Sequence, residues 1–404
     1  MTRSDEIGSN PTPRTSRLAF ALPDISDAEI DAVVKVLRSG WLTTGHVTKE
    51  FEAAFARKLA VDHAVAVNSG TAALHLALDA IGIGQADEVI VPSYTFAATA
   101  EVVRYFGAKP VLVDVKADDL TIDVQAIEAA VTERTRAVIG VDIGGWPCDW
   151  PMLRSVALRY GLKLIDDAAH ALPSSLCGRA VGTWADLTAF SFYATKTLTT
   201  GEGGMLVTYD SSWADRARMM SLHGISNDAW RRYSAGGSWY YEIIAPGFKY
   251  NMTDVAAALG LAQLQRLDEM TARRVRIAGL YAELLQDVDE VELPKAPLNG
   301  TTSWHLYPLR LNLEELQCDR AAFIEQLAAR SIATSVHFIP LHLHPYYRSL
   351  YGYKPMDFPV SYREYLRLVS LPIYSRMSDR DVLDVAQAIR QTIDRCRASS
   401  LSRS

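Results

Sequence analysis

The sequence has 404 residues, of which 49% are hydrophobic and 22% charged, and these are ordinary proportions for a globular protein large enough for more than one domain. Its formal net charge of −6 argues against nucleic acid as a partner, because a phosphate backbone would meet no strong basic field. No apolar run approaches the length of a membrane span, and the polar N-terminus lacks the apolar segment of a secretory signal. We therefore expect neither a nucleic acid nor a membrane among its partners.

The cysteines and the two ends of the chain give a first indication of its environment. The four cysteines are widely separated and form no CxxC pair: Cys148, Cys177, Cys318 and Cys396. This spacing indicates neither a metal knuckle nor a redox dithiol, and it favours a reduced, cytoplasmic protein. The polar ends, 1–17 and 396–404, are predicted to be flexible tails.

The first predicted helix starts at Ser26, where Ser26 and Glu29 form a capping box, and it ends at Gly40. After it, apolar runs rich in Val and Ile alternate with helical patterns, the runs covering 63–68, 88–93, 110–115, 137–143 and 162–167. Such continuous strands separated by helices indicate a mostly parallel sheet that is covered on both faces. The runs 188–193 and 204–209 have no long helix between them, so part of the sheet is predicted to be antiparallel.

The pattern changes near residue 250, where a long helix is predicted from Thr253 to about Leu285. Beyond it the sequence predicts a strand at 305–311, a helix at 320–330, a strand at 333–338 and a last helix capped by Ser378. The fold class predicted from this order is α/β. A large domain over 18–265 with a mostly parallel sheet precedes a smaller C-terminal α+β domain over 266–395.

A candidate anion seat follows the first apolar run, where Ser69, Gly70 and Thr71 lead directly into a helix. Open parallel sheets bind ligands outside the carboxyl ends of their strands. Small residues at such a turn let backbone N–H groups approach an anion, and the N-terminus of a helix favours negative charge. The alternative is an ordinary tight turn with a Ser or Thr helix cap.

Two further strand ends carry ionisable residues. Asp166 and Asp167 end the run 162–167, where a buried carboxylate could pair with a cationic ring nitrogen or could cap a turn. His170 could lie beside the same ring or be an ordinary, partly buried polar residue. Lys196 follows the run 188–193, and alone it would be read as a surface lysine. Together with the anion seat, however, these residues supply what a pyridoxal phosphate site needs.

With these motifs in place, the chain resembles the DegT/DnrJ/EryC1/StrS family of sugar aminotransferases, in the fold type I class of pyridoxal phosphate enzymes. The resemblance extends from about Ala19 to Ile393. It rests on the segments GWLTTG (40–45), NSGTAAL (68–74), VPSYTFAATA (91–100), DDAAHA (166–171), FSFYATKTLTTGEGG (190–204) and PGFKYNMTDVAAALG (246–260). In combination these segments are highly specific, although each alone is only suggestive.

The resemblance implies catalytic roles for three residues. Lys196 matches the lysine that binds the cofactor covalently, and Asp167 matches the partner of its pyridine nitrogen. His170 matches the residue near the phenolic oxygen of the cofactor.

A family dehydratase would have histidine in place of the lysine, and a nucleotide-sugar oxidoreductase would have a G-x-G-x-x-G fingerprint after the first strand, which is absent here.

The remaining cofactor contacts are also implied by the resemblance. Gly70, Thr71 and Ser191 match phosphate contacts, and Phe96 matches the aromatic residue that stacks on the ring. Asn251 matches an asparagine that reaches the cofactor phosphate of the other subunit, which implies a homodimer with shared active sites. From the residues alone, Asn251 would pass as a helix-start residue.

The resemblance further implies an amino transfer from L-glutamate to the keto group of a nucleotide-linked (UDP, dTDP or GDP) keto-sugar. The stretch KTLTTGEGG (196–204) resembles relatives that act at C-4 of the sugar, whereas relatives acting at C-3 more often have a KNLGAxGDGG-like stretch. A C-3 aminotransferase and a cofactor-binding regulator without turnover are the alternatives. Substrate contacts are predicted for five residues: Thr44, Lys249, Tyr250, His337 and His342.

The histidines of HFIPLHLHPYY (337–347) lack the accompanying carboxylates or thiolates of a metal site, so no metal is expected there. Two positions depart from the family pattern. Asp142 replaces the histidine of a PVHxxGxPxD stretch, and His46 replaces a proline after TTG. Both departures are expected to lie nearer the substrate than the cofactor and therefore to affect sugar specificity.

Overall fold

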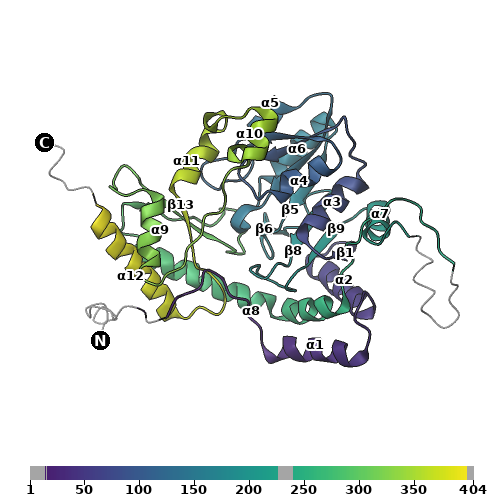
Figure 1. The fold of residues 1–404 in the computed structure, drawn as a ribbon, viewed down its shortest axis with the longest axis horizontal. Helices are drawn as coiled ribbons and strands as arrows, with labels where there is room; N and C mark the ends of the chain where they lie inside the picture. The colour runs from purple at the N-terminus through teal and green to yellow at the C-terminus, as the bar shows by residue number, and fades with distance from the viewer. Residues whose placement is uncertain (1–13, 15, 226–239, 398–404) are drawn as a thin grey trace.

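The computed structural model describes residue 14 and residues 16–225 and 240–397. The long helix α8 (Asp254–Leu285) runs beneath a large domain and continues into a smaller one (Figure 1). The domain boundary predicted after residue 265 falls inside this helix and stays a prediction. Most of the two predicted tails lies outside the described residues. No helix in the described part of the chain is both long and apolar enough to cross a membrane.

The large domain is built on a seven-stranded sheet of order β1-β9-β8-β5-β4-β2-β3. Its strands are β1 (His63–Val67), β2 (Glu88–Pro92), β3 (Lys109–Val113), β4 (Thr135–Val141), β5 (Lys163–Asp167), β8 (Leu187–Ser191) and β9 (Gly204–Thr208). Strand β9 is antiparallel to β1 and to β8, and the other pairings are parallel. The predicted mostly parallel sheet with an antiparallel part is thus confirmed.

Helices cover both faces of this sheet (Figure 1). They include α3 (Gly70–Ala80), α4 (Ala98–Tyr105), α5 (Val124–Ala130), α6 (Trp150–Tyr160) and α7 (Ser211–Ser221). Strand β2 shows why its run is continuously apolar, because Val91 packs in a core cluster with Leu76 of α3 while its neighbour Ile90 packs with Trp150 and Leu153 of α6. Successive side chains of one strand therefore enter two different cores.

The N-terminal region contributes two helices that pack on α8. Helix α1 (Asp27–Ser39) has the predicted Ser26–Glu29 capping box and ends at Gly40, whose φ of 76° is left-handed. Helix α2 (His46–Leu59) was not predicted. Its signal was present in the sequence, since buried Phe51, Phe55 and Leu59 recur every four residues.

The small domain contains a three-stranded antiparallel sheet of order β10-β12-β13, formed by β10 (Val291–Glu292), β12 (Tyr307–Leu311) and β13 (Leu368–Leu371). Its helices are α9 (Arg320–Ala328), α10 (Pro345–Tyr351), α11 (Pro359–Arg367) and α12 (Asp379–Cys396), with Ser378 capping α12 as predicted. The strand predicted at 333–338 is wrong. Only Ser335 pairs, with Ser370 of β13, because the chain then leaves the sheet and takes His337 towards the large domain.

A third sheet, also of three strands, joins the two parts of the chain. Its order is β11-β6-β7, with β11 (Gly300–Thr301) from the C-terminal part beside β6 (Ser175–Leu176) and β7 (Arg179–Ala180) of the large domain. This pairing holds the segment that leads into β12 against the large domain.

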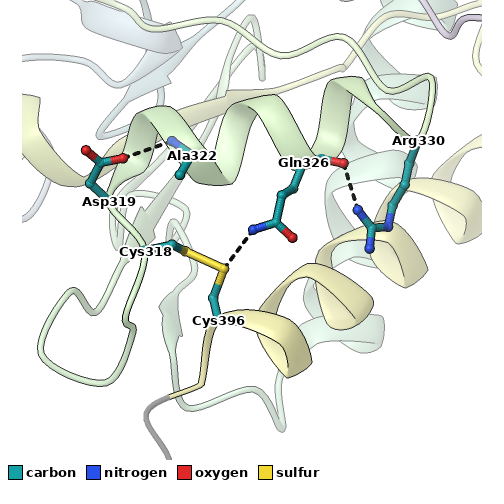
Figure 2. Close-up of a disulfide and its surroundings, with 6 residues drawn as sticks. All are labelled: Cys318, Asp319, Ala322, Gln326, Arg330 and Cys396. Atoms are coloured by element: carbon teal, nitrogen blue, oxygen red, sulfur yellow. Dashed lines mark hydrogen bonds between the residues drawn. A yellow bond between two sulfur atoms is a disulfide. The ribbon is translucent and has the colours of Figure 1, made fainter.

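A disulfide links Cys318, just before α9, to Cys396 at the end of α12 (Figure 2). The side chain of Gln326 on α9 donates to the Cys396 sulfur at 3.0 Å. The expectation of reduced cysteines is therefore wrong for this pair, which no sequence pattern indicated because the two residues are 78 positions apart. Helix α12 also extends one residue into the predicted C-terminal tail. Cys148 and Cys177 are free.

Candidate active site

A cavity of about 450 Å³ lies at the carboxyl ends of the parallel strands and brings together most of the predicted site residues. Those lining it are Gly70, Thr71, Phe96, Asp167, His170, Ser191, Lys196 and His337. They come from segments far apart in the chain: the start of α3, the end of β5, the end of β8 and the small domain. The location agrees with the rule that open α/β sheets bind ligands at this edge.

Lys196 enters the cavity from the turn that follows β8. Its backbone N–H donates to the Tyr193 carbonyl at 2.9 Å, and the turn closes where Thr200 N–H donates to the Phe192 carbonyl, also at 2.9 Å. Burial lowers the pKa of Lys196 to about 8, although the charge of Asp167 opposes this shift. With a pKa of about 8, roughly a tenth of this lysine is neutral at pH 7, far more than of an ordinary lysine, and the neutral amine is the form that attacks a carbonyl.

Asp167 ends β5 and is 6% exposed. Its Oδ2 accepts a hydrogen bond from Thr99 Oγ1 at 2.7 Å, and its Oδ1 accepts one from the Ala169 N–H at 3.3 Å. Burial raises the pKa of Asp167, while these two hydrogen bonds and the charge of Lys196 act to lower it. A cation placed against this carboxylate would compensate its desolvation and favour the charged pair.

His170 has a fixed tautomer. Its Nδ1 accepts a hydrogen bond from the Gly144 N–H at 3.1 Å, so in the neutral ring the proton is on Nε2. Burial, with the charges of Lys196 and His337, holds the pKa of His170 well below its usual range. His170 is therefore an uncharged hydrogen-bond donor in the cavity wall.

The predicted anion seat forms the start of α3. Ser69 caps this helix, since its Oγ accepts the Ala72 N–H at 3.0 Å, so the simple cap reading is correct for Ser69. The turn also faces the cavity with Gly70 and Thr71. A Cβ on Gly70 would lie 2.9 Å from the Ser191 Cβ, and only glycine lets Ser191 approach the turn this closely. The seat therefore offers backbone N–H groups and two hydroxyls to an anion.

Phe96 contributes an aromatic ring that is 59% exposed, which is unusual for phenylalanine. Its ring centroid is 5.7 Å from that of Phe338, another residue lining the cavity. An exposed ring at the edge of a cavity leaves an aromatic face free for a planar ligand.

Four predicted residues form a separate group beside the end of β1 and do not line the cavity: Thr44, Lys249, Tyr250 and Asn251. The side-chain amide of Asn251 donates to Thr44 Oγ1 at 2.7 Å. The Tyr250 hydroxyl is 3.0 Å from His75 Nδ1, and the Tyr250 carbonyl accepts the Asn68 N–H at 2.7 Å. Asn68, which makes this contact, directly precedes Ser69 in the chain, so the group lies next to the anion seat.

His342 also lies outside the cavity. It is fully enclosed, with its ring centroid 4.7 Å from that of Phe358, and burial lowers its pKa to about 4. Its ring nitrogens have no hydrogen-bond partner among the described residues. Substrate contact by His342 stays a prediction that this position does not favour.

The expectation for Asp142 requires a correction, because this residue is fully buried beside Asp167 and does not line the cavity. Its Oδ1 accepts the Cys148 N–H at 2.7 Å and the Trp150 indole N–H at 3.2 Å, and its own N–H donates to the Asp167 carbonyl. Burial raises the pKa of Asp142 to about 7. Asp166, which is on the same face of the sheet as Asp142, is also fully buried. His46 is exposed at the start of α2.

The sequence analysis missed Thr99, which donates to Asp167, and did not single out His305 and Phe338, which line the cavity. Thr99 lies four residues after Thr95 within the motif that was identified, so its position one helical turn from that residue was a usable signal. His305 comes from the predicted strand at 305–311, and no local pattern distinguished it from a strand residue. Within the described residues, no group of three potential metal ligands occurs.

The residues present fit pyridoxal phosphate. Three features converge on one cavity: the buried carboxylate of Asp167, the lowered pKa of Lys196, and the N-terminus of α3 at Gly70, where only glycine allows so close an approach. These are the groups that pair with the ring nitrogen, bind the aldehyde and hold the phosphate. Fold and site together define a fold type I pyridoxal phosphate enzyme.

Comparisons with known proteins identify the family. Residues 23–390 match the DegT/DnrJ/EryC1/StrS aminotransferase family, and the chain belongs to it. The spore coat polysaccharide biosynthesis protein SpsC of Bacillus subtilis is 48% identical over 381 residues, covering 94% of this chain and 98% of SpsC. A sugar aminotransferase of Streptococcus pneumoniae in its pyridoxal phosphate form has a TM-score of 0.87 and 34% identity, covering 94% of this chain and 99% of that one.

A third relative adds a ligand. The structure of DesI in the presence of its TDP-sugar product has a TM-score of 0.84 and 34% identity, covering 95% of this chain and 94% of that one. The protein is therefore a sugar aminotransferase that depends on pyridoxal phosphate, as the sequence predicted.

Proposed function

We propose that this aminotransferase transfers the amino group of L-glutamate to the C-4 keto group of a nucleotide-linked keto-deoxysugar, with UDP, dTDP or GDP as the nucleotide. The amino sugar formed would serve a surface polysaccharide or a glycosylated metabolite. Amination at C-3 is the alternative position, and a regulator that binds the cofactor without turnover is the alternative class.

The observation that carries this proposal is the convergence of Lys196 and Asp167 on one cavity beside the neutral ring of His170. When bound, the cofactor supplies an electron sink for a carbanion formed at the carbon that bears the amino group. A regulator would need the anion seat but not a lysine whose pKa burial has lowered to about 8. The lysine therefore favours turnover over binding alone.

Lys196 is proposed to move the proton. Its neutral Nζ takes the proton from the α-carbon of the amino donor, and in the second half of the reaction it delivers a proton to the sugar carbon that receives the amino group. Asp167 is proposed to accept the hydrogen bond of the cationic ring nitrogen, with Thr99 holding its Oδ2 in place. His170, whose Nδ1 accepts the Gly144 N–H, would donate its Nε2–H to the phenolic oxygen of the cofactor.

The remaining contacts would fix the orientation of the cofactor. Gly70, Thr71 and Ser191 are proposed to bind its phosphate at the start of α3, and Phe96 to stack on its ring. His337 lines the same cavity from the small domain, which supports its role as a substrate contact.

A homodimer with shared sites is proposed because Asn251 does not line the cavity of its own chain. Its amide is held by Thr44 beside Lys249 and Tyr250. As a group these four residues could reach the cavity of a second copy, where Asn251 would contact the phosphate.

The choice of C-4 rests on the stretch 196–204, and the choice of a nucleotide sugar draws on the relatives. DesI was solved in the presence of a TDP-sugar, and SpsC is a polysaccharide biosynthesis protein. For the location of the protein in the cell we retain the cytoplasm as a proposal, although the disulfide removes the argument from reduced cysteines.

The proposal is tested by incubating the purified protein with glutamate and UDP-, dTDP- and GDP-linked 4-keto and 3-keto sugars, and reading the aminated carbon by NMR. Amination of a 4-keto sugar at C-4 is the expected result. Amination of a 3-keto sugar alone would establish the alternative position. No amination of any sugar, by protein that binds pyridoxal phosphate, would favour the regulator.

A further inference from the structure

His305 reaches the cavity from the small domain and is held there by contacts to the large domain. Ser303 donates its hydroxyl to the His170 carbonyl at 2.6 Å, and the Leu306 N–H donates to the Gly144 carbonyl at 3.3 Å. Gly144 is also the residue whose N–H fixes the His170 ring. The segment that carries His305 is therefore anchored to the same backbone that orients His170.

The rings of His305 and His170 are in direct contact, with centroids 4.4 Å apart and planes inclined by 40°. His305 is 7% exposed, and both residues line the cavity. Protonating both rings would place two positive charges in contact at a buried site that also holds Lys196, and this is energetically unfavourable. Burial accordingly holds the pKa of His305 well below its usual range, and a positive charge on Lys196 or on a protonated His170 lowers it further.

The position of the proton on His305 follows from its surroundings. Its Nδ1 is enclosed and has no hydrogen-bond partner among the described residues. An enclosed N–H without an acceptor is costly, so the neutral ring keeps its proton on Nε2. Nε2 is then the ring atom left to meet a ligand, and it presents a donor just as His170 does.

We propose that His305 Nε2–H acts beside His170 Nε2–H as a second uncharged donor to an anionic oxygen bound in the cavity. This goes beyond the proposed function, which assigns no role to His305. The oxygen belongs either to the phenolic group of the cofactor or to the carboxylate of the amino donor. Two neutral donors stabilise an anion without placing another positive charge beside Lys196, which has to remain able to lose its proton.

The test compares three variants that separate the two ring nitrogens. His305→Gln keeps an N–H donor near the position of Nε2, His305→Asn keeps one near Nδ1, and His305→Leu keeps neither. His63→Leu, at the opposite edge of the sheet where β1 begins, is the matched control. Circular dichroism and thermal unfolding of each variant without cofactor establish that the fold is intact.

Two measurements distinguish the sources of the oxygen. The first is the dissociation constant of pyridoxal phosphate from protein without substrate, read by fluorescence. The second is the glutamate concentration that half-saturates the single-turnover loss of the visible absorbance of bound cofactor. We expect His305→Leu and His305→Asn to weaken one of these about tenfold, with His305→Gln within about threefold of wild type, as for loss of a hydrogen bond to a charged group.

A change in the first measurement assigns the oxygen to the cofactor, and a change confined to the second assigns it to the donor. The proposal is overturned if the Gln variant is as impaired as the Leu variant, which would show packing alone, or if all three behave like His63→Leu. Failure of wild type to react with glutamate would count against the proposed donor. In that case the cofactor measurement decides the role of His305 by itself.

Discussion

Thr99 donates a hydrogen bond from Oγ1 to Oδ2 of Asp167 at 2.7 Å, within a site where both side chains are buried. The Thr99 hydroxyl is in turn 2.8 Å from that of Thr95. The carboxylate is therefore held by a short chain of hydroxyls on the segment that leads into α4. This contact explains how an aspartate that burial would protonate can be kept ready to pair with a cation.

Replacing Thr99 by Val should weaken cofactor binding. Because the Thr99 hydrogen bond lowers the pKa of Asp167, its loss raises that pKa further, and more of the carboxyl is protonated at a given pH. We expect about tenfold weaker binding of pyridoxal phosphate, with the largest loss at the acidic end of the range. Thr99→Ser keeps the hydroxyl and should bind normally.

Asp167→Asn should nearly abolish turnover in a folded protein, and normal activity in that variant would remove the role of Asp167.

Hybrids of two inactive variants should recover activity if active sites are shared. In a dimer of one Lys196→Ala chain and one Asn251→Ala chain, one site would carry both changes and the other neither. Mixing the two proteins under conditions of subunit exchange should therefore restore up to about a quarter of wild-type activity, since half of the dimers are hybrids with one intact site. Unchanged inactivity, with exchange demonstrated by tagged chains, would place Asn251 in the site of its own chain.

The sequence predicted the part of the site that is local. Strand runs, the turn at 68–71 and the positions of Asp167 and Lys196 at strand ends follow from periodicity and from where a parallel sheet binds ligands. The structure then had only to bring these strand ends to one edge. Asp167 and Lys196 meet there because β5 and β8 are neighbours in the sheet.

The rest depends on packing between distant segments. His305 enters the cavity because β11 pairs with β6 and because Ser303 bonds to His170, contacts that no local pattern indicates. The 333–338 run has a strand composition, but its pairing ends at Ser335. Asp142 was expected near the substrate, yet its hydrogen bonds to Cys148 and Trp150 hold it in the protein interior, away from the cavity lining.

Capture of the cofactor by protein prepared without it should depend on pH through Lys196. Since burial lowers the pKa of Lys196 to about 8, the neutral amine accumulates as pH rises through that value. The rate of covalent capture, followed by visible absorbance, should rise with a midpoint near pH 8. Asp167→Asn removes the charge that raises this pKa and should move the midpoint to lower pH. A midpoint above pH 10, or absorbance retained in Lys196→Ala, would show that another amine reacts.

Asp142 should make folding stability fall as pH rises. Its pKa is about 7 in the folded protein against 3.8 for a free aspartate, so between these values the unfolded chain binds fewer protons. The contribution of Asp142 is complete below pH 3.8 and is lost as pH rises through about 7. Asp142→Asn keeps an acceptor for Cys148 and Trp150, and its free energy of unfolding should fall less than that of wild type across this range. An equal fall in both proteins would mean that Asp142 is ionised when folded.

The disulfide between Cys318 and Cys396 should stabilise the small domain by closing a long loop. The two residues are 78 positions apart, and constraining an unfolded loop of that size contributes about 2–4 kcal/mol to folding. Reduction, or Cys318→Ser, should lower the denaturation midpoint, whereas Cys177→Ser, which changes an exposed free cysteine, should not. Oxidised protein unfolded without reductant should show the thiols of Cys148 and Cys177 alone. If the thiols of all four cysteines react under those conditions, the pair is reduced and α12 is held by packing alone.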